Sequence, residues 1–430
     1  MRALGVLPIC FLAVTTSAMN DVSSSPALTP EVIRATAARI AGDVIVTPTV
    51  YAEALSRITG ADVFVKYENM QHTGSFKARG AAAKLSTLTE AQRKAGVIAA
   101  SAGNHAQGVA FHAGRMDIPA TIVMPRNTPF VKVRKTRGYG ANIVLEGETF
   151  SEAAAAADRL TQQKGLTPVH AFNDPDIMAG HGAIGFEIME AAPDLDVLVV
   201  PVGGGGLISG IAVAAKDTKP SIDIIGVETE LYPSMINFLK GQNKPCGGAT
   251  MAEGIAVGTA GTKCTPYVRA FVKDVLPVTE TGIERGISMF ATAAKTVAEG
   301  AGAAGLSALL EYPDLFRGRK VGLVLSGGNI DARMLSSILM RDLVRVGQVL
   351  TMTIELPDRP GQLEIITGIC AEMGANVLEV SHSRFAMNVS ATAARLTIMI
   401  ETRDKEHGRE VVDRIRAAGF QPIITDPGEP

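Results

Sequence analysis

The chain has 430 residues, which exceeds one ordinary hydrophobic core and predicts two or three folding units. Apolar residues make up 47% and charged residues 20%, and the net charge of −2 excludes a strong electrostatic attraction to nucleic acid or anionic lipid. The cysteines are scattered without ligand-like spacing, which predicts reduced thiols in a cytoplasmic compartment: Cys10, Cys246, Cys264 and Cys370.

Residues 1–28 are predicted to form an extension outside the folded domains. Arg2, an apolar run over residues 4–14 and Thr16-Ser17-Ala18 resemble a short signal peptide. However, Pro8 interrupts the apolar run and only one basic residue precedes it. We therefore favour an upstream start codon, with Met19 as the true start, or a disordered extension. No later apolar run approaches the length of a membrane-spanning helix, so no membrane partner is expected.

The folded chain is predicted to begin with a helix, because Thr29, Pro30 and Glu31 fit an N-cap, a first-turn proline and an acidic first turn. Apolar β-branched runs then predict strands at residues 63–65, 96–101, 120–124, 141–145, 169–172, 195–200, 222–227 and 320–325. Helical patterns occur at residues 52–58, 128–139, 149–164, 182–191 and 207–215, and after residues 77 and 102. This alternation predicts an α/β fold with a parallel sheet whose ligand site lies at the carboxyl ends of the strands.

The pattern changes near residue 346. Residues 349–356 alternate strictly, with Leu350, Met352, Ile354 and Leu356 on one face. A turn at residues 358–361 precedes a helix whose inward side chains are Leu363, Ile366, Ile369, Cys370 and Met373, and Gly374 fits its C-terminal cap. Strands at residues 376–383, 393–401 and 420–424 and a helix at residues 405–418 complete a βαββαβ order, which predicts a small ferredoxin-like module.

Lys77 stands at the start of the helix that follows the loop Thr73-Gly74-Ser75. The positive end of the helix macrodipole disfavours an ammonium there, which favours the neutral, nucleophilic amine of a Schiff-base lysine. A lone lysine at such a position is more often a solvated surface residue. The interpretation therefore depends on three other motifs.

The second motif is a run of four glycines at residues 203–206, between a predicted buried strand and a helix. Backbone amides without a Cβ can approach an anion closely, and the helix N-terminus adds positive potential, so this loop predicts a phosphate site. A dinucleotide site is an alternative, because Glu228 ends the next strand where a ribose-binding acid belongs. That alternative lacks the third glycine, since Ser209 stands in its place, and it gives Lys77 no task.

The remaining two motifs also follow predicted strands. The loop Ser101-Ala102-Gly103-Asn104-His105 opens a helix, where backbone amides can hold a carboxylate and the Asn104 amide can donate to a phenolate oxygen. Taken alone, an Asn helix cap explains this loop equally well. Ser326, at the end of the strand at residues 320–325, can contact a ring nitrogen, although Ser-Gly-Gly is also a common turn.

An amine, a phosphate site, a phenolate donor and a ring-nitrogen partner together match pyridoxal 5′-phosphate. On these motifs the chain resembles the fold-type II pyridoxal-phosphate enzymes, especially the threonine dehydratase (threonine ammonia-lyase) and serine racemase/dehydratase group. The resemblance covers residues 29–340 and rests on Ser75-Phe76-Lys77-x-Arg79-Gly80-Ala81, Ser101-x-Gly103-Asn104-His105-Ala106-Gln107-Gly108, the glycine run with Leu207, and Ser326-Gly327-Gly328-Asn329. The C-terminal module resembles an ACT domain through Asp358-Arg359-Pro360-Gly361 and Gly374-Ala375-Asn376.

The resemblance implies two open, twisted α/β subdomains in a catalytic domain at residues 29–345, with the smaller subdomain at roughly 70–170, and an ACT regulatory domain at residues 346–430. It implies that Lys77 binds the cofactor as a Schiff base and acts as the general base, and that Phe76 packs beside the ring. It further implies that Asn104 binds O3′ and Ser326 the ring nitrogen. The phosphate would bind Gly203, Gly204, Gly205, Gly206 and Leu207, and the substrate would bind Ser101, Ala102, Gly103, Asn104 and His105.

Two departures from the family pattern narrow the prediction. Ala102 stands where serine racemases have a second serine that serves as acid and base on the opposite ring face, so racemisation is not expected. Tyr232 and Ser234 occupy later places of the divalent-cation site that begins at Glu228, so no metal is predicted. Glu253 and Glu299 are candidates either for cofactor contacts or for structural salt bridges.

The leading prediction is a carbon–nitrogen lyase, a threonine ammonia-lyase. It would convert L-threonine into 2-oxobutanoate and ammonia by β-elimination of the hydroxyl, with L-serine as a weaker substrate. A serine or 3-hydroxyaspartate dehydratase is the alternative enzyme. An amino-acid-binding regulatory protein that uses the ACT module, with an inert catalytic part, is the alternative from another class.

The ACT resemblance implies a homo-oligomer, expected to be a tetramer. It also implies an allosteric effector, isoleucine or valine, with Asp358, Gly361 and Asn376 as contacts and isoleucine biosynthesis as the setting. A module that serves only assembly remains open at this point.

Overall fold

The computed structural model describes residues 27–384, 390 and 392–425, and the prediction for the first 26 residues lies outside this part of the chain. The chain forms two compact units. The first contains the chain up to Gly286 together with Val297–Asn329, and the second contains Ile287–Thr296 together with the chain from Ile330 onward. Among the described residues, no helix is long and apolar enough to cross a membrane.

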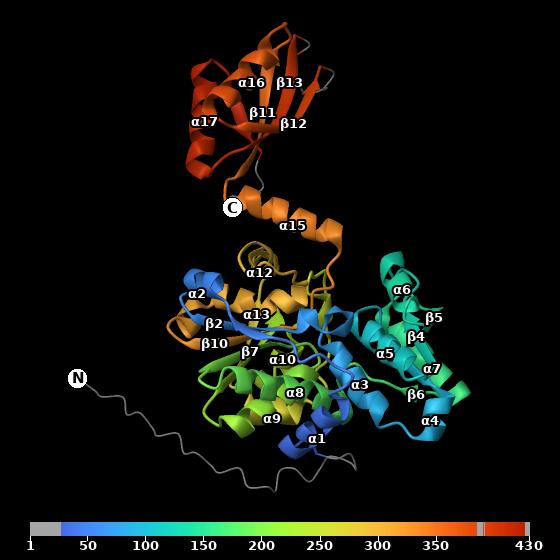
Figure 1. The fold of residues 1–430 in the computed structure, drawn as a ribbon. Helices are drawn as coiled ribbons and strands as arrows, with labels where there is room; N and C mark the ends of the chain where they lie inside the picture. The colour runs from blue at the N-terminus through green and yellow to red at the C-terminus, as the bar shows by residue number, and fades with distance from the viewer. Residues whose placement is uncertain (1–26, 385–389, 391, 426–430) are drawn as a thin grey trace, which may run out of the picture. The chain divides into compact units, whose positions relative to one another are not determined.

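A six-stranded sheet forms the centre of the first unit (Figure 1). Its strands, in spatial order, are β1 (Thr49–Tyr51), β2 (Asp62–Tyr67), β10 (Lys320–Leu325), β7 (Val197–Pro201), β8 (Asp223–Thr229) and β9 (Asp274–Val278). All neighbouring pairs are parallel except β1 with β2. Strand β7 is buried along its whole length, as expected for a parallel strand covered on both faces.

Helices surround this sheet and bury its apolar side chains. They are α1 (Pro30–Ile40), α2 (Glu53–Thr59), α8 (Pro175–Ala191), α9 (Gly206–Thr218), α10 (Ser234–Lys240), α11 (Thr265–Phe271), α12 (Glu280–Thr292), α13 (Gly300–Glu311) and α14 (Pro313–Phe316). Thr29 caps α1 as predicted, because its hydroxyl accepts from the Val32 backbone N–H. Leu28, which the sequence assigned to the extension, is buried against α8 and α9 residues.

A second, smaller parallel sheet belongs to the same unit. Its order is β5 (Asn142–Leu145), β4 (Ala120–Met124), β3 (Val97–Ala100) and β6 (Thr167–Pro168). Its helices are α4 (Glu90–Ala95), α5 (Asn104–Arg115), α6 (Phe130–Arg137) and α7 (Phe150–Lys164), and α3 (Lys77–Ser86) packs against α5 and α8. Figure 1 shows this group of strands and helices beside the larger sheet.

The strand predicted at residues 169–172 is wrong. The strand in this region is the two-residue β6, and the chain turns immediately after it. The His170 ring causes this turn, because its Nδ1 accepts from the backbone N–H groups of Phe172 and Asn173 at 3.2 and 2.9 Å. The helix predicted at residues 182–191 begins earlier, at Pro175, where the Asp174 carboxylate caps α8.

The second unit contains α15 (Ala332–Arg345) and an antiparallel sheet of order β12 (Asn376–Ser383), β13 (Ala393–Glu401), β11 (Val349–Pro357) and β14 (Pro422–Ile424). Helices α16 (Gln362–Met373) and α17 (Lys405–Ala417) complete the predicted βαββαβ order. The inward residues of β11 are all buried, and they are the four that strict alternation selected: Leu350, Met352, Ile354 and Leu356. The predicted fold class, two α/β subdomains and a C-terminal βαββαβ module, is confirmed.

Candidate active site

Three of the four predicted motifs lie at the carboxyl ends of three adjacent parallel strands. The chain reaches Lys77 after β2, Ser326 directly after β10, and the glycine run after β7, and these strands are neighbours in the sheet. The Phe76 backbone N–H donates to the Ser326 carbonyl at 3.0 Å, and Ser75 pairs with Gly327. Strand pairing therefore brings the lysine and the late serine together.

The fourth motif comes from the smaller sheet and is joined to the others by side-chain hydrogen bonds. Asn104, the first residue of α5, donates through Nδ2 to Glu299 Oε1 at 2.7 Å. Its Oδ1 accepts from Asn329 Nδ2 at 2.8 Å. Because Glu299 precedes α13 and Asn329 lies just after β10, these two bonds link the Asn loop to the larger sheet.

Lys77 is half-buried, and its amine is held inside the first unit. Its Nζ donates to the Ala171 carbonyl at 2.8 Å and lies 5.0 Å from the centre of the Phe76 ring. Burial lowers the pKa of the Lys77 ammonium to about 8, while the nearby Glu299 carboxylate opposes the shift. Desolvation therefore lowers the pKa in the same direction as the helix macrodipole to which the sequence analysis attributed the effect.

The glycine run forms the turn between β7 and α9. Gly205 has a φ of +95°, a backbone conformation that favours glycine, and directly precedes α9. A Cβ on Gly204 would lie 2.2 Å from the Phe172 ring, so the loop backbone packs directly against residues that follow the small sheet. Residues 171 and 172 thus contact both Lys77 and the glycine run.

Arg79 explains how α3 holds Lys77 in place, and sequence reasoning assigned it no role. Its guanidinium is fully buried and donates to both Glu68 oxygens at 2.8 Å, and to Glu187 of α8 at 2.6 and 2.8 Å. Lys66 of β2 also donates to Glu187. Two cations and two carboxylates therefore form a buried, charge-balanced cluster that joins β2, α3 and α8 two residues from Lys77.

The side chains of two predicted substrate contacts serve the loop itself. The Ser101 hydroxyl accepts from the backbone N–H groups of Gly103 and Ala106 at 3.2 and 3.3 Å, which caps α5. The buried His105 ring donates through Nε2 to the Val169 carbonyl at 2.8 Å. Because burial lowers the pKa of His105 to about 3, this ring is neutral near pH 7. Their side chains therefore shape the loop, and the backbone N–H groups of Ser101 and Gly103 are already used within the protein.

The acidic candidates have different surroundings. Glu228 accepts from the backbone N–H groups of Met235 and Ile236 at 2.8 and 3.0 Å, so it caps the start of α10. Glu253 forms an ion pair with Lys132 of α6. Among the described residues, no three His, Cys, Asp or Glu side chains form a group that could hold a metal ion.

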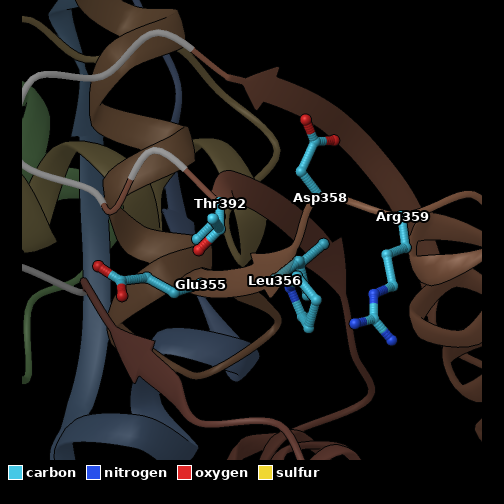
Figure 2. Close-up of a pocket in the computed structure, with 7 residues that line it drawn as sticks. Glu355, Leu356, Asp358, Arg359 and Thr392 are labelled. Carbon is cyan, nitrogen blue, oxygen red and sulfur yellow. The ribbon is translucent and has the colours of Figure 1, made fainter.

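The three effector candidates of the second unit do not come together within one chain. Asp358 follows β11, and Gly361 directly precedes α16, whereas Asn376 begins β12 beside Glu401 at the opposite end of the sheet. A hollow of about 550 Å³ lies at the Asp358 end. Glu355, Leu356, Arg359 and Thr392 are among the residues that line it (Figure 2). A ligand in this hollow would reach Asp358 but not Asn376.

The chemistry of the main site fits pyridoxal phosphate. It presents a desolvated amine on Lys77, an amide on Asn104, and a helix N-terminus at a glycine loop that excludes side chains. Ser75 Oγ is a further buried oxygen without a hydrogen-bond partner within the described part of the protein. This combination of nucleophile, anion-binding backbone and polar donors suits an aldehyde that carries a phosphate.

Comparisons with known proteins agree with this chemistry. The family model described as pyridoxal-phosphate dependent enzyme matches residues 40–327. An L-threonine ammonia-lyase of Thermotoga maritima is 47% identical over 377 residues, which cover 87% of this chain and 94% of the relative. A second L-threonine ammonia-lyase, of Geobacter sulfurreducens, is 41% identical over 87% of this chain and 94% of its own length.

Solved structures show the same likeness. Maize serine racemase superposes with a TM-score of 0.69 at 33% identity, covering 74% of this chain and 99% of the racemase. The processed form of threonine deaminase isoform 2 from Solanum lycopersicum gives 0.68 at 32% identity, covering 73% of this chain and 95% of the deaminase. The chain therefore belongs to the family of fold-type II pyridoxal-phosphate-dependent enzymes.

Proposed function

We propose that this protein is a threonine ammonia-lyase that converts L-threonine into 2-oxobutanoate and ammonia and acts more weakly on L-serine. The observation that carries the proposal is the desolvated Lys77 amine among the glycine run, the Asn loop and Ser326. The names of the two ammonia-lyase relatives support the choice of substrate.

Each role follows from the position of the residue. Lys77 Nζ would hold the cofactor and then take the Cα proton of the substrate, and a pKa of about 8 gives it an appreciable neutral fraction near neutral pH. Phe76 would pack beside the cofactor ring. Bound pyridoxal phosphate would supply the electron sink that makes the Cα proton acidic. The uncharged Ser326 hydroxyl would form a hydrogen bond with the ring nitrogen without protonating it.

The anionic groups would bind backbone amides. The N–H groups of the glycine run and Leu207, at the start of α9, would hold the phosphate, and those of the Ser101–His105 loop, at the start of α5, would hold the substrate carboxylate. The Asn104 amide would donate to O3′ of the cofactor. Racemisation is not part of the proposal, because the Ala102 methyl group can neither donate nor accept a proton.

The experiment that tests substrate choice is a comparison of kcat/KM for L-threonine, L-serine and 3-hydroxyaspartate, with the 2-oxo acid product identified by mass. We expect the largest value for L-threonine. A larger value for either other substrate would favour the serine or 3-hydroxyaspartate dehydratase. Cofactor binding without release of any 2-oxo acid would favour an amino-acid-binding regulatory protein.

We propose that residues 29–345 are catalytic and that residues 346–430, which are part of the second unit, form a regulatory ACT domain. The hollow beside Asp358 is where we place an amino-acid effector, isoleucine or valine. We also propose a cytoplasmic homotetramer that acts in isoleucine biosynthesis. The rate of threonine deamination, measured at increasing concentrations of each effector, tests this role. Asp358→Ala is the variant, and Asp413→Ala of α17 is the surface control. Inhibition that Asp358→Ala weakens would support it. If neither amino acid changes the rate, the module would serve assembly only. Analytical ultracentrifugation would then report the number of subunits.

A further inference from the structure

A chain of four hydrogen-bonded side chains crosses from α6 to α13 through the main site. Lys135 Nζ donates to Asn329 Oδ1 at 2.6 Å, and Asn329 Nδ2 donates to Asn104 Oδ1 at 2.8 Å. Asn104 Nδ2 in turn donates to Glu299 Oε1 at 2.7 Å. This series of hydrogen bonds thus begins at Lys135 on α6, beside the smaller sheet, and ends at Glu299, directly before α13 of the larger sheet.

Lys135 and Glu299, the two ends of this series of hydrogen bonds, can each play only one hydrogen-bonding role. A lysine ammonium can only donate, and an ionised carboxylate can only accept, whereas each amide between them can present either its oxygen or its nitrogen. Lys135 requires the Asn329 oxygen, which turns the Asn329 nitrogen toward Asn104. Glu299 requires the Asn104 nitrogen from the other side. Both ends therefore select the same orientation of Asn104.

We propose that Lys135 and Glu299 are positioning residues that together fix the Asn104 amide with its nitrogen, rather than its oxygen, toward the cofactor. The inference rests on the proposed function only in that Asn104 faces the cofactor O3′. The second N–H of Asn104 Nδ2 is then the donor that the phenol oxygen meets. An amide turned the other way would place two oxygens against each other.

Asn329 Nδ2 also donates to the Thr73 carbonyl at 2.7 Å, so Lys135 and Glu299 act beside a backbone acceptor, and each of the two partly covers the loss of the other. When Lys135 is lost, Glu299 still orients Asn104, and the reverse holds when Glu299 is lost. Single variants should therefore weaken pyridoxal-phosphate affinity only slightly. Loss of both leaves only the Thr73 carbonyl to orient the two amides, and should weaken the affinity by more than the product of the two single losses, up to about tenfold. A double-mutant cycle measures this non-additivity directly.

Lys132 provides the matched control. It lies on the same helix as Lys135 and also exerts its charge on Glu299, but it is paired with Glu253 and stands outside the chain of amides. A general loss of positive charge near Glu299 would affect both lysine variants alike. Only the hydrogen-bonded chain distinguishes Lys135 from Lys132.

Protonation offers a second test that leaves Glu299 in place. Burial raises the pKa of Glu299 to about 7, against hydrogen bonds from Asn104 and from the Asn329 backbone. The charged groups that act on Glu299 are Lys77 on α3, Lys132 and Lys135 on α6, and Glu253. In Lys135→Met the Glu299 carboxylate carries more of the orientation of Asn104, so cofactor affinity should fall more steeply than in the wild-type protein as the pH drops below about 7.

The experiment measures the Kd of pyridoxal phosphate for the full chain, without substrate, in two cycles: Lys135→Met with Glu299→Gln, and Lys132→Met with Glu299→Gln. Coupling in the first cycle only, together with a steeper loss of affinity below about pH 7 in Lys135→Met than in the wild-type protein, is the expected result. Additivity in the first cycle, or equal coupling in both, would overturn the inference. Threonine turnover is measured separately, so a protein that binds cofactor without deaminating threonine would refute the proposed function and leave this test intact.

Discussion

The backbone N–H of Phe76 donates to the carbonyl oxygen of Ser326 at 3.0 Å. The residue before the candidate nucleophile is therefore tied to the residue that follows β10 through the main chain. Substitution of the Ser326 side chain should leave Lys77 where it is. The reactivity of the Lys77 amine is then set by the groups that surround it and not by the Ser326 side chain.

Lys77 should react with aldehydes at a lower pH than an ordinary lysine. Because burial lowers its pKa to about 8, the neutral amine becomes the major form above about pH 8. Pyridoxal-phosphate capture by the apoprotein, followed by borohydride reduction and mass mapping of the label, should rise with pH through this value. Ser326→Ala should retain the label on Lys77. A midpoint near pH 10, or a label on another lysine, would contradict the desolvated site.

Arg79→Met should strongly destabilise the protein. Glu68 and Arg79 are both fully buried, and the substitution leaves Glu68 and Glu187 with only Lys66 to balance them. Breaking a buried pair in this way costs about 3–5 kcal/mol. Urea unfolding measures the loss, and Arg79→Lys should not restore the stability, because an ammonium cannot reproduce the forked contacts.

The control for Arg79 is Arg34→Met, which removes an exposed ion pair with Asp217. The side chains of Arg34 and Asp217 are 56% and 33% exposed, so the free energy of unfolding should change by at most about 1 kcal/mol. Equal losses for the two variants would show that the cluster at Arg79 has no special role.

Gly204→Ala should impair the glycine loop. The added methyl group would lie 2.2 Å from the Phe172 ring, and overpacking of this kind costs about 1–3 kcal/mol. Thermal unfolding and pyridoxal-phosphate affinity should both decline, and Phe172→Leu in the same chain should recover part of each. Gly42→Ala is the matched control, because no described atom lies within 4 Å of the position that its methyl group would take. No recovery in the double variant would contradict this packing argument.

Glu228 should make the protein less stable as the pH rises from 4.5 to 7. Burial raises the pKa of its carboxyl from 4.5 to about 7, although N–H groups of α10 oppose the shift. The native state therefore holds the proton more tightly than the unfolded state, and this stabilisation is lost as the pH rises through the folded pKa. Buried histidines with lowered pKa values, such as His105 and His112, contribute the opposite slope. The test is therefore the difference between the two proteins: Glu228→Gln should gain stability relative to the wild type as the pH rises from 4.5 to 7. An unchanged slope in urea unfolding would refute the assignment.

The sequence predicted the elements whose residues carry a strong local pattern. The strands predicted at residues 376–383 and 393–401 have the bounds of β12 and β13 in the structure, and strict alternation over residues 349–356 selected the buried face of β11. The strand β9 was missed, since Pro277 argues against a central strand. The structure places β9 at the edge of the sheet, where a proline is tolerated.

The motifs predicted which loops form the site, but not what holds them. Parallel strands bring Lys77 and Ser326 to one edge, which is a property of the sheet. Asn329 lies in the Ser326–Asn329 motif and Glu299 was a candidate for a cofactor contact, but no local pattern shows that both bind Asn104, which lies far from them in the sequence. For the same reason the ion cluster of Arg79 appears only when β2, α3 and α8 are packed together.

The most direct test of the account is 2-oxo acid release from L-threonine by the wild-type protein and by Lys77→Ala, with the visible absorption of each recorded alongside. We predict a coloured wild-type protein that forms 2-oxobutanoate, and a variant that has neither the colour nor the activity. A wild-type protein without colour, or a Lys77→Ala variant that still deaminates threonine, would contradict the central claim.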